Sequence, residues 1–446
     1  MHGRIVTSTV LRKAKASMPK NAATSTPVAK RVTTTSRPAR LDEIMMNKTG
    51  SCASFWRTLL ASLVAAACVS ACGGDSSESG TPAGAQAAAA SGVASGLVGT
   101  AAGTVTPTRF DIGAAGIAVR ETGTPVRDDA LFMIGSNTKA MTAMLAARLI
   151  ERGLIAWDSR IGDVLPELGS SMLPAYADVT LEQLLDHRGG VRAYTGPEDL
   201  DPFMSFVGSA PGPLPTDEAG RRLFVAAHVL QQTPPEGVVP GTTYLYSNAG
   251  YEVAAAMLER VTGQSYEALF DAEVAKPLGI AGSWGRPERT GPTQPHSYWG
   301  EPGHLAPTAP EDAQTQPWLD TLAPAGLFAT TAQGYATWLQ WQLRALNGQA
   351  TPLPAGYVQR MKAATPGHYV LGWLVGRVDG RTVLAHSGAI DGFIAEAVIE
   401  QDGSDGAFMM TNTSDIEGGV SANSWSLSTI DATLFGLYRA TRDAGN

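Results

Sequence analysis

The chain has 446 residues, of which 33 are Lys or Arg and 41 are Asp or Glu, so its formal net charge is −8. An acidic protein of this kind is not expected to bind nucleic acid or anionic membrane surfaces, because both repel it. The three cysteines and seven histidines include no close histidine pair and no thiolate cluster, so we expect no metal and no cofactor.

The first 71 residues are predicted to be a leader. Residues 1–44 carry nine basic side chains and two acids, a composition that forms no core, and Met45 or Met46 is a candidate for the true start of translation. Residues 45–71 follow the order of a secretory signal, with basic Lys48 and Arg57 before an apolar run at 59–71. This run has 13 residues. A membrane-spanning helix needs roughly 20.

The signal ends in Val-Ser-Ala-Cys, which resembles the bacterial lipobox. The resemblance implies that Cys72 is lipidated and anchors an exported lipoprotein in a membrane; Gly73 favours the outer membrane, facing the periplasm. Cleavage without lipidation is the alternative. Loss of residues 1–71 would remove 11 basic and 2 acidic side chains and leave a net charge of −17. Cys72 would then be the only thiol, so no disulfide is expected.

The remaining chain is predicted to form one domain behind a linker. Residues 72–106 are rich in Gly, Ala and Ser, which predicts a flexible tether, and the folded domain is expected at 107–442. Strand-like stretches occur at 110–121 and 125–132, and helices are predicted at 140–150 and 249–261, the latter ended by Gly263. Thr180 is predicted to cap a short helix.

Towards the C-terminus the pattern changes to strands. They are expected at 369–378, 382–386, 394–400 and 407–411, followed by a helix at 424–438. Strands at both ends with helices between them predict an α/β fold. Its sheet would be built from the N- and C-terminal segments and flanked by helices, with a mainly helical subdomain inserted at about 158–320.

Ser136 and Lys139 are the first candidates for catalysis. At the start of a helix they lie one turn apart on the same face, where the lysine can take the proton of the serine hydroxyl. Taken alone, the spacing is more often that of a helix cap and a solvated lysine, and it recurs by chance at Ser17 and Lys20. Two later motifs give it weight: Tyr246-Ser247-Asn248 and His386-Ser387-Gly388.

With these motifs in this order, the chain resembles the penicillin-recognising serine hydrolases: class C β-lactamases, D-alanyl-D-alanine carboxypeptidases and related family VIII-type esterases. Four further segments match the family in order: Thr180–His187, Lys276–Ile280, Pro324–Leu327 and Leu371–Trp373. The resemblance covers residues 107–440 and implies the β-lactamase/transpeptidase-like fold.

The resemblance also implies roles for single residues. Ser136 would be the nucleophile that forms an acyl-enzyme, and Lys139 and Tyr246 would share the proton transfer in an order that the sequence leaves open. Asn248 would bind Lys139 and substrate. The strand of His386 and Gly388 would border the cleft, and the Ala389 N–H would form the oxyanion hole with that of Ser136.

One departure bears on the substrate. β-Lactamases of the family carry lysine at position 386, and a histidine there is mostly neutral at pH 7. We therefore expect a serine hydrolase for an ester, or for a D-amino-acid peptide or amide bond. A weak β-lactamase, and a catalytically silent penicillin-binding-like lipoprotein that recognises cell-wall peptide, are the alternatives. The expected partner is a small ester, amide or peptide, and the oligomeric state stays open.

Other residues are given no catalytic role. His187, in a second His-x-Gly, is interpreted as a structural loop residue, and Trp338, Trp341 and Trp373 as core. Residues 194–215 are interpreted either as a flap over the cleft or as a solvated loop.

Overall fold

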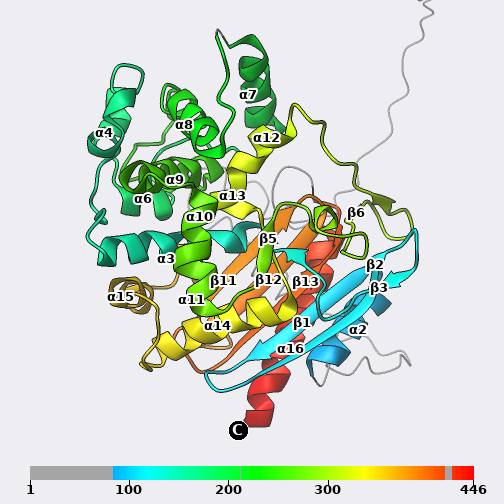
Figure 1. Ribbon diagram of the computed structural model, residues 1–446. Helices are drawn as coiled ribbons and strands as arrows, with labels where there is room; N and C mark the ends of the chain where they lie inside the picture. The colour runs from blue at the N-terminus through cyan, green and yellow to red at the C-terminus, as the bar shows by residue number, and fades with distance from the viewer. Residues whose placement is uncertain (1–83, 211, 417–423, 446) are drawn as a thin grey trace, which may run out of the picture. The chain divides into compact units, whose positions relative to one another are not determined.

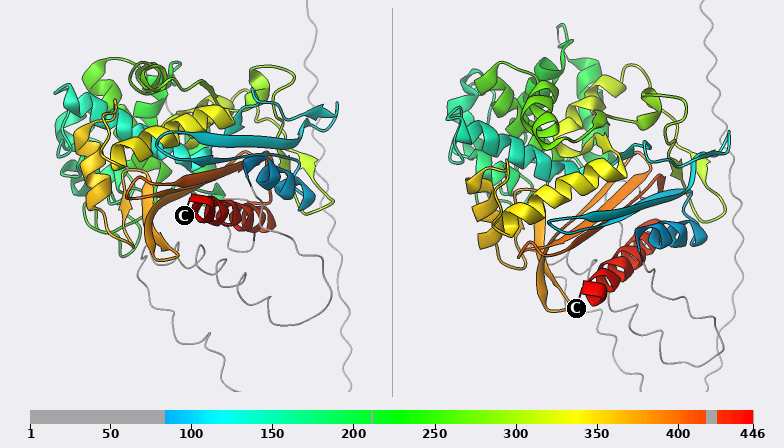
Figure 2. Two further views of the ribbon diagram at one scale, coloured as in Figure 1. Left: turned by 90° about the horizontal axis from the view of Figure 1, so that it is seen from below. Right: turned by 60° about the horizontal axis from the view of Figure 1, so that its bottom comes forward.

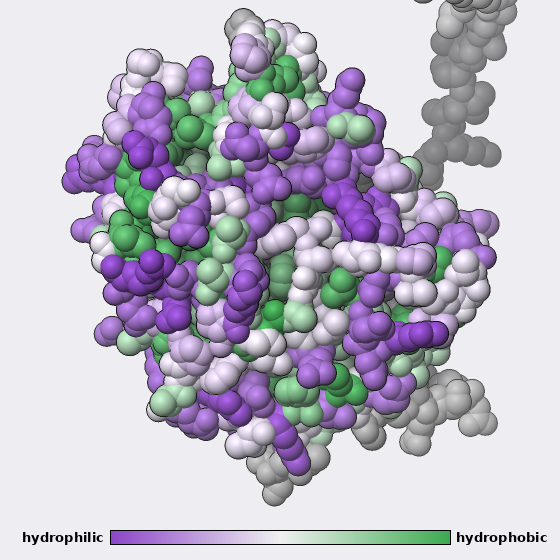
Figure 3. Space-filling view, viewed as in Figure 1, coloured by the Kyte–Doolittle hydropathy of each residue, from purple (hydrophilic) through white to green (hydrophobic). Residues whose placement is uncertain are grey.

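Figure 1 shows a computed structural model of the chain, which describes residues 84–210, 212–416 and 424–445. The predicted leader, the signal and Cys72 lie outside these residues. Within the three described stretches, no helix has both the length and the apolar character that crossing a membrane requires. On the face seen in Figure 3, hydrophilic residues predominate and hydrophobic ones show in scattered groups.

The centre of the fold is an eight-stranded antiparallel sheet with the order β3-β2-β1-β13-β12-β11-β10-β9. Its strands are β1 (Gly99–Val105), β2 (Phe110–Val119), β3 (Thr124–Pro125), β9 (Tyr369–Val370), β10 (Trp373–Val378), β11 (Arg381–Ile390), β12 (Phe393–Glu400) and β13 (Gly406–Thr411). The N-terminal strands meet the C-terminal ones where β1 pairs with β13. The sheet predicted from the two ends of the chain is therefore confirmed.

Both faces of the sheet are covered by helices. Along β12 the side chains alternate: Ala395 belongs to the same core as Trp338 of α14 (Ala332–Leu346), and Ile394 to the core of Leu434 in α16 (Trp425–Gly445). Figure 2 shows α14 on one face, with α16 and α2 (Ala85–Ala94) on the other. Because both faces are covered, all eight residues of β12 are buried.

The other side of the molecule is helical. Two buried helices organise it, α3 (Thr138–Glu151) and α9 (Asn248–Thr262). Around them lie α4 (Ile161–Val164), α5 (Pro174–Ala177), α6 (Leu181–Leu185), α7 (Pro197–Ser209), α8 (Glu218–Val229), α10 (Tyr266–Phe270), α11 (Lys276–Leu278), α12 (Gln316–Leu319), α13 (Ala323–Gly326) and α15 (Ala355–Ala363). Short strands form two small sheets: β4 (Phe132–Met133), β8 (Phe328–Thr330) and β5 (Gly282–Trp284), and β14 (Thr413–Ser414), β6 (Tyr298–Trp299) and β7 (Ala306–Pro307). Residues 158–320, predicted as the helical insertion, thus contain α4 to α12 together with β5, β6 and β7.

Local signals place the helix ends where the sequence predicts them. Thr180 and Gln183 form a reciprocal capping box on α6. Gly263 ends α9 in the left-handed conformation, with φ 68°. Trp338 and Trp373 are buried, as predicted, and Trp341 is partly buried.

The predicted tether is wrong over residues 84–106, because this segment forms α2 and the central strand β1. Its small residues serve close packing. A Cβ added to Gly92 would lie 2.5 Å from Met409 Cε, and one added to Gly103 would lie 2.3 Å from Phe408 Cε1. The Gly- and Ala-rich composition therefore reflects tight contact between a helix and a sheet, and the folded part begins well before Pro107.

A truncation tests this correction. A chain that begins at residue 84 should fold, and one that begins at residue 107 should not, because the shorter chain lacks the strand that joins β2 to β13. Circular dichroism melts would show a cooperative transition for the first and none for the second. If the shorter chain melts cooperatively near the temperature of the longer one, residues 84–106 are dispensable and the sheet order is wrong.

Candidate active site

Ser136 lies in a 3-10 turn, Gly135–Asn137, that joins β4 to α3. Gly135 has φ 53°, and a Cβ there would lie 2.7 Å from the amide nitrogen of Ala389, so the position requires glycine. The side-chain amide of Asn137 donates to the carbonyl of Ala395 in β12 at 2.9 Å. These contacts hold Ser136, which is half-buried, beside the sheet.

The Lys139 side chain is buried, and its amino group has three partners. Nζ lies 3.0 Å from Ser136 Oγ, 2.7 Å from Asn248 Oδ1 and 2.7 Å from the carbonyl oxygen of Ala325. The amide and carbonyl oxygens only accept, so they take two N–H donors. An ammonium would donate to all three partners, Ser136 Oγ included, whereas a neutral amine has two donors for these oxygens and keeps its lone pair for the hydroxyl of Ser136.

The surroundings favour this neutral amine. Burial lowers the pKa of Lys139 well below its usual 10.5, and the charge of Glu252 raises it by a smaller amount. The rings of Tyr246 and Tyr251 lie near Nζ, with centroids at 4.8 and 5.5 Å. An amine held in this way can accept a proton at a pH where a solvated lysine cannot.

Tyr246 and Asn248 come from the start of α9. Ser247 caps this helix by accepting from the Gly250 N–H at 2.8 Å, which fixes the residues on either side of it. The Asn248 amide donates to the carbonyl of Tyr194 at 2.9 Å, so its oxygen faces Lys139. Burial raises the pKa of Tyr246 above 10, and a hydrogen bond to Ser136 lowers it by less. The phenol therefore keeps its proton at neutral pH.

His386 has a different environment from the one expected of a substrate-binding residue. Its ring is 2% exposed, with Nδ1 at 2.7 Å from the carbonyl oxygen of Ser387 and Nε2 at 3.0 Å from the hydroxyl of Tyr369. Because a carbonyl only accepts, Nδ1 carries the proton and Nε2 accepts from Tyr369. Burial, together with the charge of Lys139, lowers the pKa of His386 to about 3. Both ring nitrogens thus have a partner within the protein, and the contact of His386 with substrate stays a prediction.

Gly388 brings strand β11 against the serine turn. A Cβ at this position would lie 2.1 Å from the carbonyl oxygen of Ile134 and 2.9 Å from the amide nitrogen of Ser136. On the other side of the same contact, a Cβ on Gly135 would lie 2.7 Å from the amide nitrogen of Ala389. The two amides predicted to form an oxyanion hole are therefore brought together through two glycines.

The sequence interpretation gave no site role to two neighbours of these residues, His187 and Tyr369. His187 is buried with φ 56°, accepts from the Ser247 N–H at 3.1 Å, and packs on the rings of Tyr246 and Tyr369 at centroid distances of 4.2 and 4.5 Å. His187 thus packs against the Tyr246–Asn248 motif, which agrees with the structural role predicted for it. Tyr369 precedes the Leu371–Trp373 segment, the only sequence signal near it.

In the described part of the chain, no group of three or more His, Cys, Asp or Glu side chains is placed to hold a metal ion. Around Ser136 the structure brings together a hydroxyl, an amine and a phenol.

Comparison with known proteins assigns the chain to a family. The sequence model of the Beta-lactamase family matches residues 83–426. Esterase EstB of Burkholderia gladioli is 36% identical over 176 residues, which is 37% of this chain and 41% of that protein. Penicillin-binding protein 4 of Amycolatopsis lactamdurans is 30% identical over 175 residues, 39% of this chain and 41% of that protein. The matched part thus spans less than half the length of either relative.

Solved structures share the fold. The D-amino acid amidase from Ochrobactrum anthropi SV3, complexed with L-phenylalanine amide, superposes with a TM-score of 0.59 at 21% identity, covering 81% of this chain and 98% of that one. The D-alanine carboxypeptidase AmpC from Burkholderia cenocepacia gives a TM-score of 0.57 at 19% identity, with 76% and 93% covered. The match from residue 83 onwards and the shared fold confirm the resemblance seen in the sequence: the chain belongs to the Beta-lactamase family.

Proposed function

We propose that the protein is a serine hydrolase that cleaves ester bonds, or amide bonds of D-amino acids, through an acyl-enzyme at Ser136. The observation that supports this most strongly is the contact between Lys139 Nζ and Ser136 Oγ at 3.0 Å, made by an amine whose two other partners are both acceptors. The esterase and the D-amino acid amidase named above support these two bond types.

In the proposed reaction, Lys139 takes the proton of Ser136 while Oγ attacks the substrate carbonyl carbon. The oxygen of the tetrahedral intermediate accepts from the amides of Ser136 and Ala389. Tyr246 donates its phenolic proton to the leaving group and regains one from Lys139. Water then attacks the acyl-enzyme by the same steps in reverse. Lys139 is the first base in this scheme, because its pKa is lowered whereas that of Tyr246 is raised.

Labelling with a fluorophosphonate tests the nucleophile and the base together. Below its pKa, Lys139 is mostly an ammonium without a lone pair, so in this range the labelling rate should rise about tenfold per pH unit. Above the pKa the rate should level off, and this plateau should begin well below pH 10.5. Lys139→Arg cannot deprotonate and should label about 10²–10⁴-fold more slowly, without this rise. Mass spectrometry of the labelled peptide reads out both results. No adduct on the folded protein, or an equal adduct on folded Ser136→Ala, would refute the proposal, and the absence of any adduct would favour the silent binding protein.

A substitution at Gly388 tests the oxyanion hole. Gly388→Ala puts a methyl group 2.1 Å from the Ile134 carbonyl and should push β11 away from Ser136. Loss of one oxyanion donor lowers kcat by about 10²–10³-fold. Overpacking should cost about 1–3 kcal/mol of unfolding free energy. Gly291→Ala is the matched control, since a Cβ there meets no atom of the described residues within 4 Å. Ester kinetics and thermal melts measure both effects, and unchanged kcat in Gly388→Ala would rule out this oxyanion hole.

The environment of His386 predicts the order of substrates. Since the ring is neutral and both of its nitrogens are engaged, position 386 offers no cation for the carboxylate of a β-lactam. The kcat/KM for short p-nitrophenyl esters should therefore exceed that for nitrocefin, and a D-Ala-D-Ala peptide in the same panel separates esterase from peptidase. Faster turnover of nitrocefin would favour the β-lactamase alternative.

A further inference from the structure

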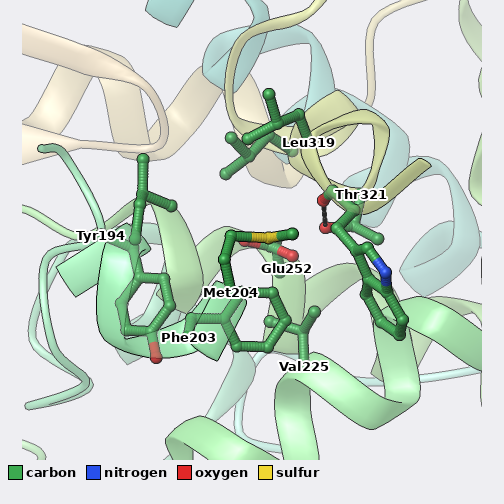
Figure 4. A pocket seen from close by; sticks show the side chains of 10 residues that line it. Tyr194, Phe203, Met204, Val225, Glu252, Leu319 and Thr321 are labelled. Atoms are coloured by element: carbon green, nitrogen blue, oxygen red, sulfur yellow. Dashed lines mark hydrogen bonds between the residues drawn. The ribbon is translucent and has the colours of Figure 1, made fainter. Parts of the chain in front are cut away.

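Beside the site lies a small hollow, partly open to solvent. Its walls come from the segment 194–204, from α8 and α9, and from residues 318–322, and they are mostly apolar or aromatic (Figure 4). Phe203 and Met204 belong to α7, so the stretch predicted as a flap or solvated loop contains a helix, and this helix forms one wall. Only about one water molecule fits within the hollow.

One acidic side chain enters this apolar space. Glu252 is 1% exposed and is the only acid among the described residues that line the hollow. Its Oε2 has no hydrogen-bond partner among the described residues. Figure 4 shows its carboxyl among Met204, Phe203 and Thr321. A buried carboxyl oxygen without a donor costs free energy, so a group that donates to it has a ready place to bind.

Hydrogen bonds of Asn248 connect residues of the hollow with the catalytic residues. Glu252 follows Asn248 by one turn of α9, and Asn248 binds Lys139. The carbonyl of Tyr194, another wall residue, accepts from the same Asn248. The side chains of Asn248 and Lys139 thus connect the hollow with Ser136, and the acyl part of a substrate that reaches the hollow would have to pass beside them.

The size and the lining of the hollow indicate which chemical group would bind there. A protonated primary amine is about as large as a water molecule and has three donors for a carboxylate. The faces of Tyr194, Phe203 and Trp318 in the walls attract cations as well. We propose that the hollow binds a protonated primary amino group on the acyl part of the substrate, with Glu252 as its counter-ion. This inference rests on the proposed acyl-enzyme at Ser136.

The test compares p-nitrophenyl esters that differ only by an ammonium in place of a methyl group. Three pairs vary the distance from the carbonyl: D-alanyl with 2-methylpropanoyl, β-alanyl with butanoyl, and 6-aminohexanoyl with heptanoyl. With the full-length protein, and after subtraction of spontaneous hydrolysis, kcat/KM for the amino ester should exceed that of its partner about tenfold or more in at least one pair. The length of the acyl chain in the pair that shows this preference indicates the distance from Ser136 to Glu252.

Two substitutions assign the preference to the hollow. Glu252→Gln keeps the size of the side chain but not its charge, and the ratio between the two esters should fall to about 1. Met204→Lys would place an ammonium on the wall beside Glu252 and should abolish the preference as well, whereas the neutral control Met204→Gln should keep it. Thermal melts of all variants establish that they are folded.

The outcomes separate this inference from the proposed function. If all neutral esters are cleaved but no pair prefers the amine, or if Glu252→Gln slows both esters equally, the hollow holds only water or Glu252 acts through Lys139, and the inference is wrong. If no ester is cleaved and Ser136 takes no label, the proposed function fails and the inference fails with it.

Discussion

The site depends on a single lysine amino group that is kept away from water. Lys139 emerges from α3, and its Nζ is held by Asn248 of α9 and by the carbonyl of Ala325 in α13. Two of these places are anchored elsewhere: α9 by the Ser247 cap, and the turn before α3 by Asn137. The fold thus brings three distant stretches of chain to one nitrogen, and burial makes that nitrogen a base.

The surroundings of this amine contain rings rather than ions. Four rings lie near Lys139, those of Tyr246, Tyr251, His187 and His386. Burial raises the pKa of the two tyrosines and lowers that of the two histidines, which favours the neutral form of each. A full negative charge in contact with Nζ would raise the pKa of Lys139 and remove its lone pair. A histidine at position 386 fits this arrangement, because the lysine found there in β-lactamases would need a counter-charge or solvent within the same buried cluster.

Sequence patterns predicted the elements whose signals are local, and failed where contacts between distant residues decide. The capping box at Thr180 and the stop at Gly263 are encoded within a few residues, so they could be read directly. The segment 84–106 could not, because its Gly and Ala residues look like a linker until Met409 and Phe408 are placed against them. The tautomer of His386 depends on Tyr369, and the exposure of Glu252 to the hollow depends on α7, α8 and α12, which no spacing in the sequence reveals.

Glu252 shows how the substrate and the base can be linked by charge. Burial raises its pKa, and Thr321, Arg222 and Lys139 lower it by less, so that the resulting pKa is about 7. Near neutral pH the free site therefore has a carboxyl that is partly ionised. When Glu252 is ionised, its charge raises the pKa of Lys139, so a smaller fraction of Lys139 is in the neutral form that acts as the base. An ammonium bound in the hollow would draw Glu252 into its charged form and also cancel that charge, so Lys139 would no longer feel it. The amino group of a correct substrate would then contribute twice, once to binding and once by keeping Lys139 neutral. An uncharged acyl group of the same shape could do neither.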